Sequence, residues 1–318
     1  MFKGCRVGVV VPAYNEERQI EDVLVTMPDF VDCIFVIDDC SADKTSDIVK
    51  HWAKRRGHAH RVRLIRHENR GGVGRAITTG YKAALEDGME VVAVMAGDGQ
   101  MDPNELPMIL EPVADGKAAY SKGNRLTSGV AWEKTPHVRY LGNAFLSLLT
   151  KIASGYWHVA DTQSGYTAIS AEALRAINLD DLYPSYGYPN DLLVRLNVRN
   201  FRVADVHIAP RYGIGERSSM KVWKVIPTVS FLLFRGFFYR MFEKYVIRDF
   251  HPLVFFYALG FLLTTIGFVL GVVETIAKIT QGNIAIATVV LVALLGISGL
   301  QLLLFAMWFD MEYNKELR

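Results

Sequence analysis

The pattern of hydrophobic and polar residues divides the 318-residue chain into two unlike parts. Up to about residue 215, short apolar runs rich in β-branched residues alternate with longer stretches of mixed polarity. This alternation predicts an α/β fold with a mostly parallel sheet, because parallel strands need helical crossovers between them. We expect strands at residues 6–14, 31–40, 61–68 and 90–98, and helices at residues 15–30, 42–56 and 72–88.

Two long apolar runs dominate the C-terminal part. Residues 252–273 and 284–309 contain no charged side chain, and each run can cross a hydrocarbon core of about 30 Å. Two buried helices of a soluble protein are the alternative, but soluble helices of this length normally keep a polar stripe. Because only residues 274–283 separate the runs, we predict a tight transmembrane hairpin.

The segment before the hairpin, residues 221–250, alternates basic residues with aromatic and aliphatic ones at helical spacing. Such a pattern is typical of helices that lie in the membrane interface. A helical connector packed on the α/β domain is a second interpretation, compatible with the first. We therefore expect a domain at residues 1–215, interfacial helices at 216–250 and the hairpin at 251–318.

Charge and cysteine content predict a location. Basic residues are frequent before the first apolar run, whereas Lys278 is the only one between the runs. By the positive-inside rule, we expect an integral membrane protein with its N-terminal domain and both chain ends in the cytoplasm. The first residues form a predicted strand and not a cleavable leader, and the three cysteines lack metal-ligand spacing, which suits a reducing compartment. The net charge of +2 gives no indication of nucleic-acid binding.

Polar residues follow each predicted strand directly. They are Asn15 and Glu16, Asp38 and Asp39, Asn69 with Gly71 and Gly72, and Asp98 with Gln100. The carboxyl ends of parallel strands meet at one edge of a sheet, where nucleotides bind. The chain has neither G-x-G-x-x-G after the first strand nor G-x-x-x-x-G-K-[ST], which disfavours a dinucleotide or P-loop site. Residues 71–74 could bind phosphate through backbone amides or form a simple turn.

Asp38 and Asp39 form a pair of acids at the end of an apolar strand. Helix capping by Ser41 or Asp43 is the simpler explanation of this segment. Capping does not account for two adjacent carboxylates, which repel each other and need hydrogen-bond donors. A base edge and ribose hydroxyls are such donors, so the pair predicts a nucleotide site.

Five segments occur in the order of a known enzyme family. The sequences VVPAYNE, VIDDCSADKT, NRGGVGRA, AGDGQ and DTQSGYTAIS resemble the consecutive motifs of the family 2 inverting glycosyltransferases of GT-A fold. More narrowly, they resemble the polyprenyl-phosphate (dolichyl-phosphate) mannose and glucose synthases, from about Val9 to Lys221. The short hairpin is similar to that of the bacterial polyprenyl-phosphate glucosyltransferases. The resemblance implies a GT-A nucleotide-sugar-binding domain that moves one sugar from a UDP- or GDP-sugar to polyprenyl phosphate, with inversion, at the cytoplasmic face of a lipid bilayer.

The resemblance also implies roles for individual residues. The nucleotide would be bound by Pro12, Tyr14, Glu16, Asp38, Asp39 and Gly71. A divalent metal, Mg²⁺ or Mn²⁺, would be held by Asp98 and Gln100. Transfer would depend on Asp98, Arg125, Asp161, Gln163 and Asp191, where Arg125 faces the donor phosphates, Asp161 and Gln163 contact the sugar, and Asp191 takes an acidic helix position. The lipid phosphate would be held by Arg139, Arg211, Arg217, Ser218 and Lys221. The same resemblance implies a homo-oligomer, a tetramer.

The chain has fewer acids than the family pattern. Ala96 stands where the family usually has an acid, and Pro189 replaces another. We therefore expect weak metal binding without the donor and stronger binding with it, because phosphates and water complete the coordination. A polyprenyl monophosphate is already ionised near neutral pH and needs no general base, whereas a hydroxyl acceptor does. The deficit thus favours a phosphate acceptor.

Three alternatives remain open. A processive polysaccharide synthase would share the fold, but the chain lacks a Q-x-x-R-W motif and has few membrane helices. A glycolipid synthase with a lipid hydroxyl acceptor would need a base near Asp191. A catalytically inactive protein would bind a nucleotide sugar and act as a membrane scaffold. The sequence distinguishes neither the sugar nor uracil from guanine.

Overall fold

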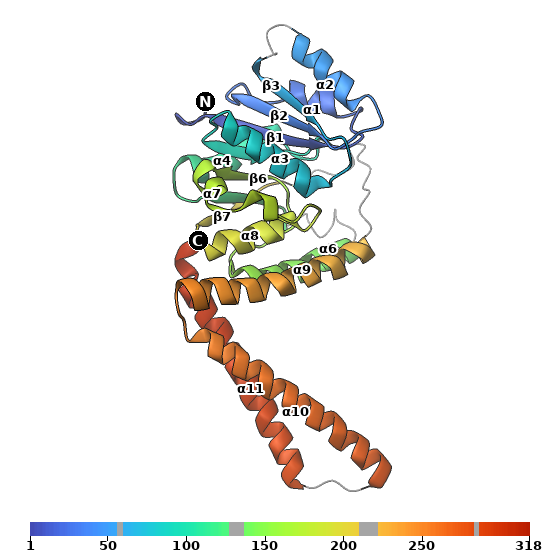
Figure 1. Cartoon of the computed structure of the whole chain (residues 1–318), viewed down its shortest axis with the longest axis vertical. Coiled ribbons are helices and arrows are strands. Elements are labelled where there is room, and N and C mark those ends of the chain that lie inside the picture. The colour runs from blue at the N-terminus through green and yellow to red at the C-terminus, as the bar shows by residue number, and fades with distance from the viewer. Residues whose placement is uncertain (56–59, 127–136, 210–221, 283–285) are drawn as a thin grey trace. The chain divides into compact units, whose positions relative to one another are not determined.

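The structure is a computed structural model of the whole chain, and it describes residues 1–55, 60–126, 137–209, 222–282 and 286–318 (Figure 1). The chain divides into two compact units. The first unit comprises Met1–Phe237 with Leu317–Arg318, and the second comprises Phe238–Glu316. We describe each unit by itself.

The first unit is built on a seven-stranded sheet with the strand order β3-β2-β1-β4-β6-β5-β7. The strands are β1 (Val7–Ala13), β2 (Cys33–Asp38), β3 (Val62–Arg66), β4 (Val91–Val94), β5 (Tyr120–Asn124), β6 (Thr167–Ser170) and β7 (Val203–His207). Neighbouring strands are parallel except that β6 runs antiparallel to both β4 and β5. The predicted α/β fold with a mostly parallel sheet is confirmed.

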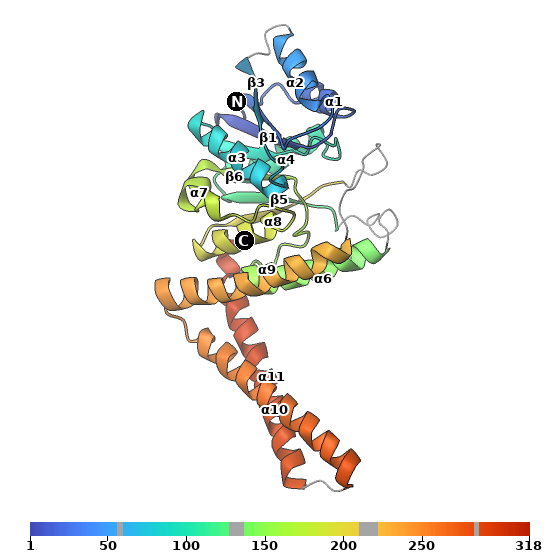
Figure 2. The ribbon, with the colours of Figure 1, turned by 45° about the vertical axis from the view of Figure 1, so that its right-hand side comes forward.

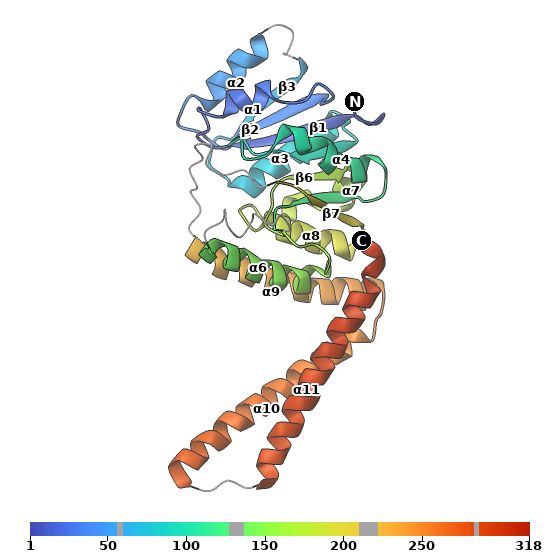
Figure 3. The same ribbon diagram turned by 180° about the vertical axis from the view of Figure 1, so that it is seen from behind.

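Helices cover both faces of the sheet (Figures 1 and 3). On one face lie α3 (Val73–Glu86), α7 (Ala171–Ala176) and α8 (Tyr188–Val198), and on the other lie α1 (Ile20–Val25), α2 (Thr45–Lys54) and α4 (Leu106–Ala114). The central strands are buried on both faces, since every residue of β2 and β4 is buried. Continuous apolar runs are what a doubly covered parallel sheet requires.

The first helix is shorter than the sequence predicts. We expected a helix over residues 15–30, whereas α1 begins at Ile20 and ends at Val25. Asn15 has a positive φ of 57°, and its amide donates to Ser41 Oγ at 2.9 Å. The amide of Glu16 donates to Thr45 Oγ1 at 2.9 Å. The backbone before α1 is thus bonded to the loop after β2, and this long-range pairing replaces the first helical turns.

The glycine-rich segment before α3 lies close to another part of the backbone. The amide of Arg75 donates to the Pro184 carbonyl at 3.1 Å. A Cβ atom added at Gly74 would lie 2.2 Å from the Tyr183 carbonyl oxygen, and Gly72 has a φ of 93°. Only glycine permits this approach without displacing the backbone.

We expect Gly74→Ala to lower the free energy of unfolding by about 2 kcal/mol, because backbone atoms must move to admit the methyl group. Gly142→Ala is the matched control, since its Cβ would make an ordinary contact at 3.6 Å with Ile226 Cδ1. Thermal unfolding of the two purified variants in detergent, followed by circular dichroism, measures the difference. Equal midpoints would show that residues 183–184 shift freely.

Two further helices of the first unit lie side by side, as Figures 1 to 3 show: α6 (His137–Ser154) and the part of α9 (Val222–Phe242) up to residue 237. α9 also packs against α8, because a Cβ at Gly236 of α9 would lie 3.2 Å from Val194 Cγ2 of α8. Phe231 and Phe234 are more than 60% exposed on the other side of α9, whereas Val229 and Leu233 are buried. This part of α9 therefore has one packed face and one exposed aromatic face.

The second unit contains the end of α9, a π-helical turn at Glu243–Arg248, and the long helices α10 (Leu253–Gln281) and α11 (Ile286–Tyr313). Leu253–Thr280 and Ile286–Tyr313 are long and apolar enough to cross a membrane. α10 is longer than the predicted run because no glycine or proline interrupts residues 274–281. Gly282, with a φ of 74°, ends the helix.

A buried polar cluster joins both ends of the second unit. Arg240 and Asp310 have no exposed surface, and their side chains form two hydrogen bonds of 2.7 and 3.0 Å. Tyr245 OH donates to Asp310 Oδ1 at 2.6 Å, and Lys244 Nζ donates to Asn314 Oδ1 at 2.8 Å. Burial alone would lower the pKa of Arg240, but the Asp310 carboxylate raises it. The guanidinium is therefore a buried cation paired with the Asp310 carboxylate.

Candidate functional site

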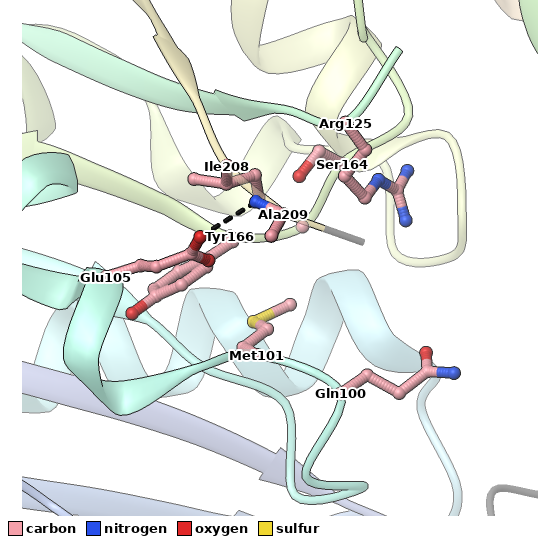
Figure 4. Close-up of a pocket in the computed structure, with 9 residues that line it drawn as sticks. Gln100, Met101, Glu105, Arg125, Ser164, Tyr166, Ile208 and Ala209 are labelled. Atoms are coloured by element: carbon pink, nitrogen blue, oxygen red, sulfur yellow. Dashed lines mark hydrogen bonds between the residues drawn. The ribbon is translucent and has the colours of Figure 1, made fainter. Parts of the chain in front are cut away.

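A pocket opens at the edge of the sheet where β4, β5 and β7 end and β6 begins (Figure 4). Its lining residues are Gln100, Met101, Glu105, Arg125, Ser164, Gly165, Tyr166, Ile208 and Ala209. Gln100 and Arg125, which the sequence assigned to the same site, therefore lie on one pocket. Glu105 was not predicted as a site residue. Its Oε1 accepts from the Ala209 amide at 2.7 Å and ties the loop after β7 to the start of α4.

Arg125 is held by Asp161. Arg125 Nε donates to Asp161 Oδ2 at 2.7 Å, and Nη2 donates to Oδ1 at 3.3 Å. The side chain of Asp161 is fully buried, whereas that of Arg125 is 26% exposed. Burial would raise the pKa of Asp161, but the charge and hydrogen bonds of Arg125 lower it below its usual value. A buried carboxylate thus holds the guanidinium that lines the pocket.

Lys122 lies beneath this pair and was not predicted as a site residue. Its side chain is fully buried on β5, and Nζ donates to the Ser164 carbonyl in the turn that lines the pocket. Burial lowers the pKa of Lys122 to about 7, opposed by the charge of Asp161. A lysine within a buried strand was the available signal, because such a side chain must bond to something inside.

The loop after β4 carries Asp98 and Gln100. Asp98 Oδ1 accepts from the Gln100 amide at 3.0 Å across Gly99, whose φ is 73°. Asp102 accepts from the Asn104 amide at 2.9 Å and so caps the short helix Pro103–Glu105. The two acids of this loop therefore differ in role: Asp102 caps a helix, whereas Asp98 lies at the edge of the sheet.

Asp38 and Asp39 bond to different loops. Asp38 is fully buried, and it accepts from the Ser41 amide at 2.8 Å and from the Ser46 hydroxyl. Asp39 accepts from the amides of Gly71 and Gly72, both at 2.8 Å.

His67 Nδ1 lies 2.8 Å from Asp39 Oδ1, and its Nε2 lies 3.0 Å from Thr79 Oγ1. Burial would raise the pKa of Asp39, but the hydrogen bonds from His67 and from the two glycine amides lower it. The hydrogen-bond donors that Asp38 and Asp39 require are thus supplied in part by the protein itself. Contact of Asp38, Asp39 and Gly71 with a nucleotide stays a prediction.

Tyr14 and Pro12 lie at the end of β1 and are half-buried. The Arg70 guanidinium carbon lies 3.9 Å from the centroid of the Tyr14 ring, in cation–π geometry. Arg70 was not among the predicted residues, because nothing in the local pattern distinguishes it from other surface arginines. It connects the segment before α3 with the loop after β1.

The sequence profile of "Glycosyl transferase family 2" matches residues 8–177, more than half of the chain. The chain belongs to this family. One relative is the UDP-N-acetylglucosamine--dolichyl-phosphate N-acetylglucosaminyltransferase of Methanococcus voltae, which is 28% identical over 216 residues, 65% of this chain and 86% of that protein. The undecaprenyl-phosphate mannosyltransferase of Micrococcus luteus is 31% identical over 207 residues, 64% of this chain and 82% of that protein.

The fold is shared with a solved structure. Glucosyl-3-phosphoglycerate synthase from Mycobacterium tuberculosis, determined with Mn²⁺, uridine diphosphate and glucosyl-3-phosphoglycerate, superposes with a TM-score of 0.54 at 22% identity. The match covers 74% of this chain and 80% of that one. The predicted membership in the family 2 glycosyltransferases, with the GT-A fold, is confirmed, and the chain is an enzyme of that class.

The side-chain oxygens of the loop after β4 suit a hard divalent cation, but they supply only part of its coordination. Asp98 and Gln100 offer a carboxylate and an amide oxygen, which Mg²⁺ and Mn²⁺ accept. Burial, followed by the charges of Asp98 and Asp43, raises the pKa of Glu16 to about 7. Within the described ranges, no group of three or more histidine, cysteine, aspartate or glutamate side chains could hold a metal ion. Phosphate oxygens would have to complete the coordination.

Asp191 bonds away from Gln163. Its Oδ2 accepts from the Tyr183 amide and from Arg195 Nε, both at 3.0 Å. The neighbouring residue on α8, Asn190, instead bonds to Gln163 at 3.1 Å. The structure therefore brings Arg125, Asp161 and Gln163 together. The predicted role of Asp191 stays a prediction.

The residues predicted to hold a lipid phosphate fall mostly outside the described part of the chain. Arg211, Arg217, Ser218 and Lys221 lie in residues 210–221, which the structure does not describe. Arg139 lies on α6, but its side chain is not described.

Proposed function

We propose that this family 2 glycosyltransferase moves one sugar from a nucleoside-diphosphate sugar to polyprenyl phosphate, with inversion. The observation that carries the proposal is that Arg125, held by Asp161, lines the same pocket as Gln100 of the Asp98 loop. A diphosphate leaving group is stabilised by cations. Arg125 supplies one, and a divalent cation bound at the Asp98 loop would supply a second. The acceptor is supported by two relatives whose names specify dolichyl phosphate and undecaprenyl phosphate.

The nucleotide would bind at the end of β1 and β2. Pro12, Tyr14 and Glu16 come from the loop after β1, and Asp38, Asp39 and Gly71 from the network beside it. Uridine diphosphate in the related fold supports UDP as one candidate donor carrier, and GDP is the other. The divalent cation, held by Asp98 and Gln100, would stabilise the negative charge of the departing diphosphate.

The reaction would be a single displacement. An oxygen of the acceptor phosphate attacks the anomeric carbon, the bond to the donor diphosphate breaks, and the configuration inverts. No proton must be removed from the acceptor, because a monophosphate is ionised near neutral pH. Positioning and charge stabilisation by Arg125 would therefore supply most of the catalysis.

The membrane arrangement is part of the proposal. We assign residues 1–215 to a cytoplasmic catalytic domain, 216–250 to interfacial helices and 251–318 to the transmembrane hairpin. The exposed phenylalanines of α9 suit a lipid interface, and the excess of cations before α10 suits a cytoplasmic position. Arg139, Arg211, Arg217, Ser218 and Lys221 would hold the lipid phosphate, and the protein would assemble as a homo-oligomer.

The test is a transfer assay of the purified protein in detergent. A short-chain polyprenyl phosphate is offered with a panel of UDP- and GDP-sugars, with Mg²⁺, Mn²⁺ or EDTA, and the lipid product is identified by mass spectrometry. We expect product from one donor, lost with EDTA. Binding of a nucleotide sugar without product would instead support a hydroxyl acceptor or an inactive scaffold.

A further inference from the structure

Gln163 lies beside the turn that lines the pocket. It directly precedes Ser164 and Gly165, which line the pocket, and its amide donates to Asp161 Oδ1 at 3.2 Å. Its side chain is partly exposed, whereas Asp161, Thr162 and Ser164 are buried. Because Arg125 also donates to Asp161, the partly exposed side chain of Gln163 belongs to a residue that shares this carboxylate with Arg125.

Both N–H groups of the Gln163 side chain are directed into the protein. Nε2 donates to Thr162 Oγ1 at 3.0 Å and to Asn190 Oδ1 at 3.1 Å. A primary amide has two N–H donors and one carbonyl oxygen. Since both donors are used inside, Gln163 is left with its carbonyl oxygen, a hydrogen-bond acceptor, to offer to a ligand.

Asn190 fixes this orientation. It is fully buried on α8, and its Oδ1 also lies 3.2 Å from Thr150 Oγ1. Its amide nitrogen is buried and has no hydrogen-bond partner among the residues that the structure describes. An unsatisfied buried donor lowers stability. The contact with Gln163 therefore comes with one unsatisfied donor, a cost that an apolar side chain would avoid.

Asp191 is bonded differently, although it is adjacent in sequence. Successive residues of a helix point about 100° apart. Asp191 accordingly contacts Tyr183 and Arg195, which brace the segment before α8. Asp191, which the sequence pattern favours, and Asn190, which contacts Gln163, therefore lie on different faces of α8.

We propose that Asn190, and not Asp191, is the residue of α8 that positions the donor sugar, by holding Gln163 so that its carbonyl oxygen accepts from a sugar hydroxyl or amide N–H. The inference rests on the proposed glycosyl transfer. Asn190 is a positioning residue, because it acts through Gln163.

The experiment uses the full-length protein, the donor sugar identified for the wild type, and a set of its analogues in which single hydroxyl groups are replaced by fluorine. Fluorine cannot donate a hydrogen bond. For each enzyme, the discrimination is the ratio of kcat/KM for the natural donor to kcat/KM for the analogue. For one analogue, we expect this ratio to be about tenfold larger in the wild type than in Gln163→Leu. Asn190→Leu should lose the same preference, with an unfolding midpoint close to that of the wild type.

Three variants keep the test decisive. Asp191→Asn, the matched control, should lower the unfolding midpoint and leave the discrimination unchanged. Asn190→Asp keeps the oxygen that accepts from Gln163 and should retain the discrimination. If Asn190→Leu does not fold, the comparison of Asn190→Asp with Gln163→Leu tests the proposal. In the double variant Asn190→Leu/Gln163→Leu, the two losses should not add.

The inference is overturned when Asn190→Leu and Gln163→Leu keep the wild-type discrimination, or when Asp191→Asn is the variant that loses it. A wild-type protein that transfers no sugar from any donor contradicts the proposed function instead, so the two failures are distinct.

Discussion

Asp98→Asn is expected to reduce sugar transfer by roughly 10²–10³-fold, with little change in stability. The asparagine oxygen can still accept from the Gln100 amide, so the turn after β4 should persist. What is lost is the negative charge that would help to hold a divalent cation, an effect of about 3–4 kcal/mol on the transition state. The measurement is kcat/KM at increasing Mg²⁺ or Mn²⁺, where the variant should need more metal or fail to saturate.

Asp102→Asn is the matched control for this loop. It makes the same chemical change four residues later, at a carboxylate that caps the helix Pro103–Glu105. Asparagine is an equally good cap, so both activity and stability should remain near those of the wild type. If Asp98→Asn were as active as Asp102→Asn at every metal concentration, the metal role of Asp98 would be refuted.

Asp310→Asn is expected to lower the free energy of unfolding by about 3–5 kcal/mol. The change leaves the fully buried guanidinium of Arg240 without its counter-charge, and an uncompensated buried charge is the costly outcome. In the full chain in detergent, this should lower the unfolding midpoint by roughly 10 °C, as followed by helical circular dichroism.

Two controls separate charge burial from a general effect of substitution near the end of α11. Glu312→Gln removes an exposed partner of Lys315, 3.1 Å away, and should cost less than about 1 kcal/mol. Arg240→Met combined with Asp310→Leu removes both charges and should recover most of the stability. A single Asp310→Asn variant as stable as Glu312→Gln would mean that water reaches Arg240.

The sheet could be predicted from the sequence because its signal is local. The apolar runs that became β1, β2 and β4 are continuous, and such runs require burial on both faces. The direction of β6 could not be predicted in the same way. The sequence of a short buried strand does not indicate whether the strand runs parallel or antiparallel to its neighbours. The shortened α1 was missed for a related reason, because its first turns are replaced by bonds to residues of another loop.

The same distinction between local signals and contacts distant in sequence applies to the candidate site. The position of Asp98, Arg125 and Asp161 at one sheet edge followed from strand ends and from the resemblance. Their partners are separated in sequence, as with Lys122 and Ser164 or Gln163 and Asn190, and local patterns do not report such pairs. The pairing of Arg240 with Asp310 was likewise hidden, because the two residues are 70 positions apart.

The strand order also limits how the chain can fold while it is synthesised. β3, β2, β1 and β4 are neighbours and can pair once residue 94 has been made, whereas β5 must wait for β6 and β7, its partners on either side. The β4 edge therefore has no partner until residues 167–170 have been made, and a domain that folds as a unit must wait for them. The pocket can become complete only after residue 209, and this still precedes the synthesis of α10. All residues that line the pocket are thus synthesised before the apolar hairpin.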